Sequence, residues 1–486
     1  MAPLRTYAPA AWLASLLVLP AAAYVGGVRQ EQVEQRPKEP FPAFNRSSLP
    51  NEKTYPRIER AVLDRLPLRS AALSVRGHLA LDVFGRSPSE QVLLGDGRWL
   101  FFRDELRACS DARPVVSTAD AMSLMALSSV ASGRRTLVTL AGSKMVAERR
   151  RLRSEGFSRT DLDCVRQLEA EVHERLGQTP GGVDLRAPMA AAARLAPAGS
   201  AYYRYDTHWN GAGQAVFARA VAEAVRPGLA AAAKLGPGPE TVSHAGDLGR
   251  LMGVPLSEPY TPPAAPTRPA GEPAGKGVVL IGDSQLEAAF TRRPTSNPAL
   301  IDQLLPSAVH CTRDEYADGR CDDAMRRSTS FVYETVGRNA KEIGDGCWRA
   351  VSVLTERLGG RPSAYAIGGR RIAAPTVTVG ASGQLPASVI PAGGARSPHP
   401  RLLQIPVVSF PAGAADAKVA LIQQPVGELS PCVTPEQKVP GRVLTLPVPA
   451  SRDAATYRVV LQAPPGTVLG RPEEIVLDGT RQPDRR

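Results

Sequence analysis

The strongest constraint on the fold is an alternation of short apolar runs with segments of helical spacing. Each run has four or five residues rich in β-branched or aromatic side chains, as buried strands do. The runs are Gln91–Leu94, Thr136–Leu140, Gly277–Ile281 and Ser330–Tyr333. The helical segments are Ser117–Ser132, Leu162–Leu176 and Gly211–Val225. Strands that alternate with helices indicate a parallel sheet flanked by helices, and we assign residues 51–350 to such an α/β domain.

A different pattern begins after about residue 350, where short apolar runs are separated by Gly and Pro turns. These runs are Thr376–Val379, Leu402–Ile405, Val419–Ile422, Val443–Leu446, Tyr457–Leu461 and Ile475–Leu477. Without convincing helices between them, they predict a small C-terminal β-sandwich over 375–486, joined by a linker at 351–374. A carbohydrate-binding role and a purely structural role both fit this part.

The N-terminal segment has the features of an export signal. Arg5 precedes an apolar run from Ala10 to Ala23, and Arg29 follows it. This predicts either a cleaved signal peptide or a single membrane anchor over 1–30, followed by a polar, Pro-rich flexible linker over 31–50. Both interpretations place the protein in the periplasm, and the second holds it at the inner membrane.

The cysteines and the net charge narrow the function classes. Six cysteines in an exported chain favour disulfides, and Cys311 with Cys321 could close a short loop, although sequence does not reveal pairing. No C-x-x-C pair and no His at ligand spacing occurs, so we expect no metal and no cofactor. The net charge of +12 is scattered and aromatic residues make up 5%, which argues against nucleic-acid binding.

The first candidate for chemistry is the turn after an apolar strand, Gly282-Asp283-Ser284. Open α/β sheets place reactive groups at the carboxyl ends of their strands. Gly282 permits a tight turn there, and we expect Asp283 to stiffen it. Gly, Asp and Ser are also ordinary turn residues, so the tripeptide alone is weak evidence for Ser284 as a nucleophile.

The second candidate is the pair Asp206 and His208. A carboxylate two residues before a histidine can orient the imidazole and leave its other nitrogen free to accept the Ser284 proton. A lone histidine is as often structural, but with the Ser284 turn downstream the set predicts a Ser–His–Asp triad. We expect Trp209 to pack beneath His208 and exclude water.

The order Asp206-x-His208-Trp209, then strand-Gly-Asp-Ser284, resembles the alginate O-acetyltransferase family, a group of SGNH-hydrolase-like acetyltransferases. Further similar segments are Asp64–Arg69, Val92–Phe101, Leu140–Lys144, Val183–Leu185, Tyr202–Tyr203 and Val332–Arg338. The resemblance spans about residues 40–345. It implies an SGNH-like fold with Ser284 as nucleophile, His208 as general base and Asp206 as its orienter. The chain departs from the family at Gln285, where an aromatic residue is usual, and at Gly337, where a Glu precedes the Arg.

The resemblance also implies a function, transfer of acetyl groups onto hydroxyls of an exported polysaccharide through an acetyl-serine. A membrane acyltransferase would donate the acetyl group, alongside export proteins of the inner membrane and periplasm. The alternatives are a cell-envelope carbohydrate acetyl esterase and a non-catalytic glycan-binding protein. We expect substrate contacts from Arg338, Lys144 and Trp209, although Arg338 also fits a salt bridge and Lys144 a structural role.

Overall fold

The computed structural model describes most of the chain before residue 357 and the strands of the C-terminal part. The described residues are 39–42, 54–63, 69–110, 118–153, 156–196, 199–233, 241–262, 264, 266, 275–286, 300–356, 366–371, 377–378, 401–409, 418–423, 437–438, 443–448, 457–462, 465–471 and 473–477. Among these residues, no helix combines the length and apolar character needed to cross a bilayer. The N-terminal signal or anchor predicted at 1–30 lies outside the described residues, as does most of the predicted linker at 31–50.

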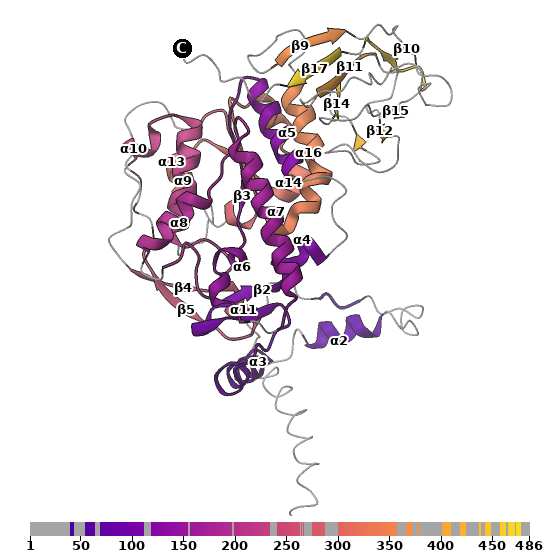
Figure 1. Ribbon diagram of the computed structural model, residues 1–486. Helices are drawn as coiled ribbons and strands as arrows, with labels where there is room; N and C mark the ends of the chain where they lie inside the picture. The colour runs from indigo at the N-terminus through magenta and orange to yellow at the C-terminus, as the bar shows by residue number, and fades with distance from the viewer. Residues whose placement is uncertain are drawn as a thin grey trace, which may run out of the picture.

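A parallel four-stranded sheet forms the centre of the α/β part, and Figure 1 shows its strand β3 among the flanking helices. Its strands, in spatial order, are β3 (Arg135–Ala141), β8 (Ser330–Val336), β6 (Val278–Gly282) and β7 (Val309–Thr312). Every residue of β6 and β8 is buried, as expected of parallel strands covered on both faces. The parallel sheet predicted from sequence is confirmed.

Two of the sequence predictions for strands need correction. The run at Gln91–Leu94 is β1 (Val92–Leu94), which pairs with β2 (Leu100–Phe102) in a separate antiparallel hairpin rather than in the parallel sheet. The edge strand β7 was missed, because its four residues include the polar pair His310 and Thr312 and have no apolar run.

Helices cover both faces of the sheet. Successive strand residues point to opposite faces, so Val138 packs in one apolar cluster and its neighbour Leu137 in the other. The first face is covered by α5 (Thr118–Ala131), α7 (Arg159–Gly177) and α16 (Ala340–Thr355). The second face is covered by α8 (Arg186–Leu195), α9 (Gly211–Val225) and α13 (Leu300–Leu304).

Shorter elements surround these layers. Before the sheet, α2 (Tyr55–Leu63) and α3 (Arg69–His78) lie on either side of Pro67. The other helices are α4 (Arg107–Ser110), α6 (Lys144–Ala147), α10 (Leu229–Ala232), α11 (Asp247–Leu251), α14 (Arg313–Ala317), α15 (Asp322–Arg327), and the single turns η1 (Leu79–Val83), η2 (Asp96–Arg98), η3 (Arg103–Leu106), η4 (Arg149–Arg151) and η5 (Gly337–Asn339). A second hairpin joins β4 (Val242–Ala245) to β5 (Ser257–Tyr260).

The C-terminal part consists of antiparallel sheets, which confirms the predicted fold class. One sheet has the order β10-β16-β11-β17-β9, with β14 also paired to β11, and the other has the order β13-β12-β15. The strands are β9 (Ala366–Arg371), β10 (Val377–Thr378), β11 (Arg401–Ser409), β12 (Lys418–Gln423), β13 (Gln437–Lys438), β14 (Val443–Val448), β15 (Tyr457–Gln462), β16 (Val468–Leu469) and β17 (Glu473–Leu477).

Two described stretches of the linker predicted at 351–374 are regular structure. The helix α16 continues to Thr355, and residues 366–371 form β9. Leu354 shares one apolar cluster with Leu402 and Ile405 of β11. Gln404 Nε2 also donates a hydrogen bond to the Thr355 carbonyl at 2.9 Å. The larger sheet therefore packs directly on α16.

Disulfides fix two places in the α/β part. Cys109 of α4 pairs with Cys164 of α7, and Cys311 of β7 pairs with Cys321. The second pair closes the short loop that the sequence allowed. Cys347 is also disulfide-bonded. Such bonds persist in oxidising compartments, so they fit an exported envelope protein.

We predict that Leu402→Ala, which removes a fully buried side chain of β11, lowers the free energy of unfolding by about 2–5 kcal/mol. Tryptophan fluorescence in a denaturant titration measures this, because Trp99, Trp209 and Trp348 lie in the α/β part and no tryptophan follows Trp348. The matched control is Val408→Ala on the same strand, where the side chain is 61% exposed. An unshifted tryptophan transition in Leu402→Ala would show that the C-terminal sheet unfolds separately.

Candidate active site

The carboxyl ends of the parallel strands bring together segments distant in sequence. β6 ends at Gly282 and leads into Ser284, while β8 ends at Val336 and leads into η5 with Arg338. The loop that carries Asp206 and His208 precedes α9, whose N-cap is Asn210. Because these strands run in the same direction, their ends meet at one edge of the sheet.

Asp283 anchors the turn that carries Ser284. Its Oδ1 accepts a hydrogen bond from the Gln285 backbone N–H at 3.1 Å. Its Oδ2 accepts from the Val336 N–H at 2.7 Å and from Asn339 Nδ2 at 3.2 Å. The side chain is buried, so these bonds replace its contact with water. The stiffening expected of Asp283 is thus carried out by bonds to the end of β8.

Gly282 is required at this turn because the space around it leaves no room for a side chain. A Cβ there would lie 2.6 Å from Leu286 Cδ2 and 3.0 Å from Glu334 Oε2. Burial raises the pKa of Glu334 well above its ordinary value and so favours the neutral carboxyl beneath the turn. The absence of a side chain at Gly282 therefore lets the Ser284 turn sit closely on β8.

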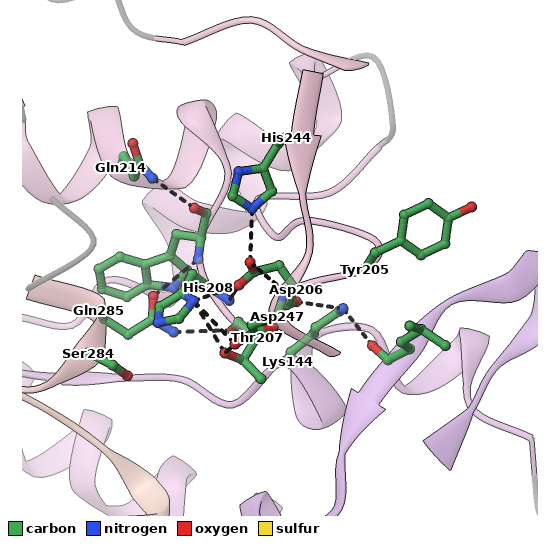
Figure 2. A network of polar contacts seen from close by, with 12 residues as sticks. Lys144, Tyr205, Asp206, Thr207, His208, Gln214, His244, Asp247, Ser284 and Gln285 are labelled. Carbon is green, nitrogen blue, oxygen red and sulfur yellow. Dashed lines mark hydrogen bonds and ion pairs between the residues drawn. The ribbon is translucent and has the colours of Figure 1, made fainter. Parts of the chain in front are cut away.

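Asp206 and His208 form a close pair (Figure 2). Asp206 Oδ1 lies 2.5 Å from His208 Nδ1 and also accepts the His208 backbone N–H at 2.9 Å. The carboxylate can only accept, so Nδ1 carries the proton. Among the described residues His208 Nε2 has no hydrogen-bond partner, and it is therefore free to accept a proton.

Two residues that the sequence analysis missed complete the surroundings of Asp206. His244 Nε2 donates to Asp206 Oδ2 at 2.9 Å, and the Asp247 backbone N–H donates to the same oxygen at 3.1 Å. The His244 ring stacks on Tyr203, with ring centroids 3.9 Å apart. Asp247 accepts from the Thr207 hydroxyl at 2.6 Å. No motif marks these residues, because the β4–β5 hairpin and α11 bring them to the site through tertiary packing.

The hydrogen bonds decide the charges of the pair. Burial opposes the charge of Asp206, but the bonds from His208 and His244 outweigh it and hold the pKa of the carboxyl well below its ordinary value. Burial also disfavours charged His208, but the bond and charge of Asp206 prevail and raise the pKa of the imidazole. Asp206 is thus an anion that makes His208 a stronger base.

Asp206, His208 and Asp247 also have the spacing of a metal-ion site. The 2.5 Å contact between Asp206 Oδ1 and His208 Nδ1 leaves no room for an ion between those two atoms, because metal–ligand bonds of about 2 Å separate ligand atoms further. This arrangement suits proton transfer.

Ser284 lies at the same edge as His208, with its side chain partly exposed. Its Oγ accepts a hydrogen bond from Arg338 at 3.2 Å, and among the described residues Ser284 and His208 are not directly bonded. The next residue, Gln285, bonds to the backbone on both sides of His208, at Thr207 and Trp209. Figure 2 shows Ser284 and Gln285 beside the His208 loop.

Arg338 directly contacts Ser284 through its guanidinium, as a substrate-binding residue at this site should. Its guanidinium lies over the Phe102 ring, 5.6 Å from the centroid. No carboxylate among the described residues lies within 4.0 Å of it, so the salt bridge considered as an alternative is not formed there. Its charge is therefore available to a group bound at Ser284.

Lys144 is placed differently from the substrate contact expected of it. The side chain is 1% exposed, and Nζ donates to the carbonyls of Leu100, Arg204 and Asp206 at 2.6–3.0 Å. An ammonium has three protons, so no donor is left for a substrate. Burial lowers the pKa of Lys144 to about 8. The side chain acts on the site by holding the backbone of Asp206.

Trp209 packs beneath the loop, as expected, rather than against solvent. Its indole is 2% exposed and lies 5.4 Å from Phe217 of α9, centroid to centroid. The sequence reasoning grouped it with substrate-binding residues, and burial gives it instead a supporting role under His208. Trp99 and Phe101 are also buried.

Comparison with known proteins defines first a class and then a family. Residues 92–289 match a family model described as SGNH hydrolase-like domain, acetyltransferase AlgX. The matched segment is therefore an SGNH hydrolase-like domain, the class of acyltransferases and esterases to which the site residues also point. Within that class the matched segment is similar to the AlgX-type acetyltransferases, in agreement with the resemblance to the alginate O-acetyltransferase family.

Two solved structures are similar to the chain over long stretches. AlgX of Pseudomonas aeruginosa is 13% identical, with 81% of this chain and 92% of that chain covered and a TM-score of 0.36. The O-acetyltransferase domain of Pseudomonas putida AlgJ is 21% identical, with 55% and 99% covered and a TM-score of 0.36. No curated protein matches the chain.

We predict that Lys144→Met lowers the free energy of unfolding by about 3 kcal/mol or more, because three buried carbonyls lose their donor. Denaturant titration measures the loss, and Lys276→Met, at an exposed position, is the control. The KM of the folded variant for a chromogenic acetyl ester should stay unchanged. A stable variant with a raised KM would instead support the substrate contact first expected.

Proposed function

We propose that the protein is an O-acetyltransferase that moves acetyl groups onto hydroxyls of an exported polysaccharide, with Ser284 as the acetyl carrier. One observation carries the proposal. His208 is held through Nδ1 by the Asp206 carboxylate at 2.5 Å, and its loop is bonded to the residue after Ser284. The AlgX-type family match over residues 92–289 supports acetyl transfer as the chemistry.

In the first step, Ser284 Oγ attacks the carbonyl carbon of the acyl donor while its proton passes to His208 Nε2. A C–O bond forms and the carbonyl oxygen becomes an oxyanion. Collapse of this intermediate breaks the bond to the donor, whose leaving oxygen or sulfur takes the proton from His208. The acetyl group is then an ester of Ser284, and Asp206 stabilises the imidazolium throughout.

In the second step, a sugar hydroxyl takes the place of the donor. His208 Nε2 accepts the hydroxyl proton as the sugar oxygen attacks the acetyl-serine carbonyl. The ester bond to Ser284 then breaks, and His208 returns the proton to Oγ. Water attacking by the same route would make the protein an esterase, so exclusion of water decides between the two outcomes.

Arg338 is the residue best placed to assist both steps. Its Nη2 lies 3.2 Å from Ser284 Oγ, so a positive charge is already next to the oxygen that gains and loses the acetyl group. Such a fixed donor favours the negative charge that develops on the substrate without reorganisation. We assign Arg338 to oxyanion stabilisation or to orienting Ser284.

The cellular compartment and the partners of the protein follow from the same proposal. The acetyl donor is a membrane acyltransferase, and the protein works in the periplasm with export proteins and a polysaccharide acceptor. The C-terminal sheets are a candidate surface for the polysaccharide, and N-terminal anchoring to the inner membrane would bring the site to its donor. The disulfides of the α/β part are consistent with this compartment.

We predict that Ser284→Ala abolishes acetyl release from a chromogenic acetyl ester, because it removes the hydroxyl that carries the acetyl group in the proposed reaction. Intact-mass spectrometry of the wild type should show an added acetyl group that Ser284→Ala lacks. Equal rates in the two proteins would refute the assignment. Incubation with an acceptor oligosaccharide separates the functions, since a gain of acetyl supports transfer and a loss supports the esterase.

We predict that acetyl release falls as the pH is lowered, with a midpoint above the ordinary histidine pKa of about 6.5, because protonated His208 cannot accept the Ser284 proton. Asp206→Asn should move this midpoint down, since the carboxylate raises the His208 pKa. It should also lower the rate by about 10²–10⁴-fold. Asp184→Asn, whose carboxylate pairs with the buried His173 rather than with His208, is the control. An unchanged midpoint in Asp206→Asn would refute the pairing.

A further inference from the structure

We propose that Gln285 is a positioning residue that sets the distance between Ser284 and His208 by binding the two peptide groups on either side of the histidine. The inference rests on the proposed function, because it concerns how the nucleophile and the base of that reaction are held at the right distance from each other. It assigns a role to the position where this chain departs from the aromatic residue usual in the family.

The contacts of Gln285 join the two halves of the site. Its Oε1 accepts the backbone N–H of Trp209 at 3.1 Å, and its Nε2 donates to the carbonyl of Thr207 at 3.3 Å. These two peptide groups flank His208, while Gln285 itself follows Ser284. Through one side chain, the turn at the end of β6 is thus bonded to the loop before α9, 76 and 78 positions away in sequence.

The chemistry of the amide makes this bridge specific. An N–H can only donate and a carbonyl can only accept, so the two backbone partners fix which end of the Gln285 amide faces which peptide group. Glu at this position would present an oxygen to the Thr207 carbonyl, and an apolar side chain would satisfy neither group. Gln285 is 4% exposed, so water does not readily replace its bonds.

The backbone of Gln285 is itself held in place by the turn that carries Ser284. The Gln285 backbone N–H donates to Asp283 Oδ1 at 3.1 Å, and Asp283 is in turn bonded to the end of β8. The Gln285 side chain therefore projects from a turn that is already fixed to the sheet. Displacement of the His208 loop away from Ser284 requires both amide bonds to break, so the sheet sets the position of the base.

The test compares Gln285→Met and Gln285→Glu with the wild type. Met has a similar length and removes both bonds, whereas Glu keeps the acceptor for Trp209 and loses the donor to Thr207. The readout is the second-order rate of Ser284 labelling by an uncharged alkyl fluorophosphonate, with the labelled residue identified by mass spectrometry. We expect labelling to fall about 10–100-fold in Gln285→Met, because a displacement of about 1 Å costs that much.

Gln214 provides the matched control. It is also a glutamine bonded to this loop, with Nε2 donating to the Trp209 carbonyl at 3.1 Å (Figure 2), but it lies on α9 and, among the described residues, has no bond to the Ser284 turn. Gln214→Met should therefore label within about twofold of the wild type. Labelling that falls equally in Gln214→Met would mean that any weakening of the loop matters, and would overturn the role of Gln285.

Two further measurements separate positioning from general stability. The strongly downfield proton NMR resonance expected for His208 Nδ1–H should persist in Gln285→Met, since Asp206 still holds the ring, and the pH midpoint of labelling should stay unchanged. Normal labelling of the folded protein with only a lower melting temperature would overturn the inference. If Gln285→Met does not fold, the labelling rate of Gln285→Glu is compared with the wild type instead, and an unchanged rate would overturn the inference.

The outcomes for the two proposals are distinct. If the fluorophosphonate does not label Ser284 in the wild type, the proposed function fails. If the wild type is labelled at Ser284 and Gln285→Met and Gln285→Glu are labelled at the same rate, the function stands and the positioning role of Gln285 is refuted.

Discussion

A carboxylate removed from water remains charged only if hydrogen bonds replace its hydration. Asp206 meets this condition with bonds to both of its oxygens. Oδ1 is held by the ring and backbone of His208, and Oδ2 by His244 and the Asp247 N–H. Two separate segments of chain, residues 206–208 and 244–247, must therefore come together before the charge can be buried. The loop before α9 and the segment that joins β4 to α11 are consequently coupled through a single side chain.

The features that sequence could predict are those encoded by neighbouring residues. The burial of β6 follows from its run of apolar side chains, and the turn after it from Gly282 and Asp283. The pairing of Asp206 with His208 follows from their spacing of two, which the structure realises as a contact at 2.5 Å. In each case the information lies within a few positions, so a local pattern is enough.

The features that sequence could not predict arise from contacts between distant segments. His244 reaches Asp206 only because the hairpin folds back over the loop, and Lys144 is buried only because three carbonyls converge on its ammonium. The amide of Gln285 looked like a departure from a family pattern, and its backbone partners lie more than seventy positions away. β7 went unseen because hydrogen bonding to β6, rather than its own composition, makes it a strand.

The packing of β11 on α16 affects how chimeric proteins can be built from this chain. Leu402 and Ile405 share an apolar cluster with Leu354, and Gln404 bonds to the last residue of the helix. An exchange of the C-terminal sheets with those of a relative would place new side chains against an unchanged helix surface. The exchanged segment should begin before α16, at η5, so that both sides of the contact come from the same parent.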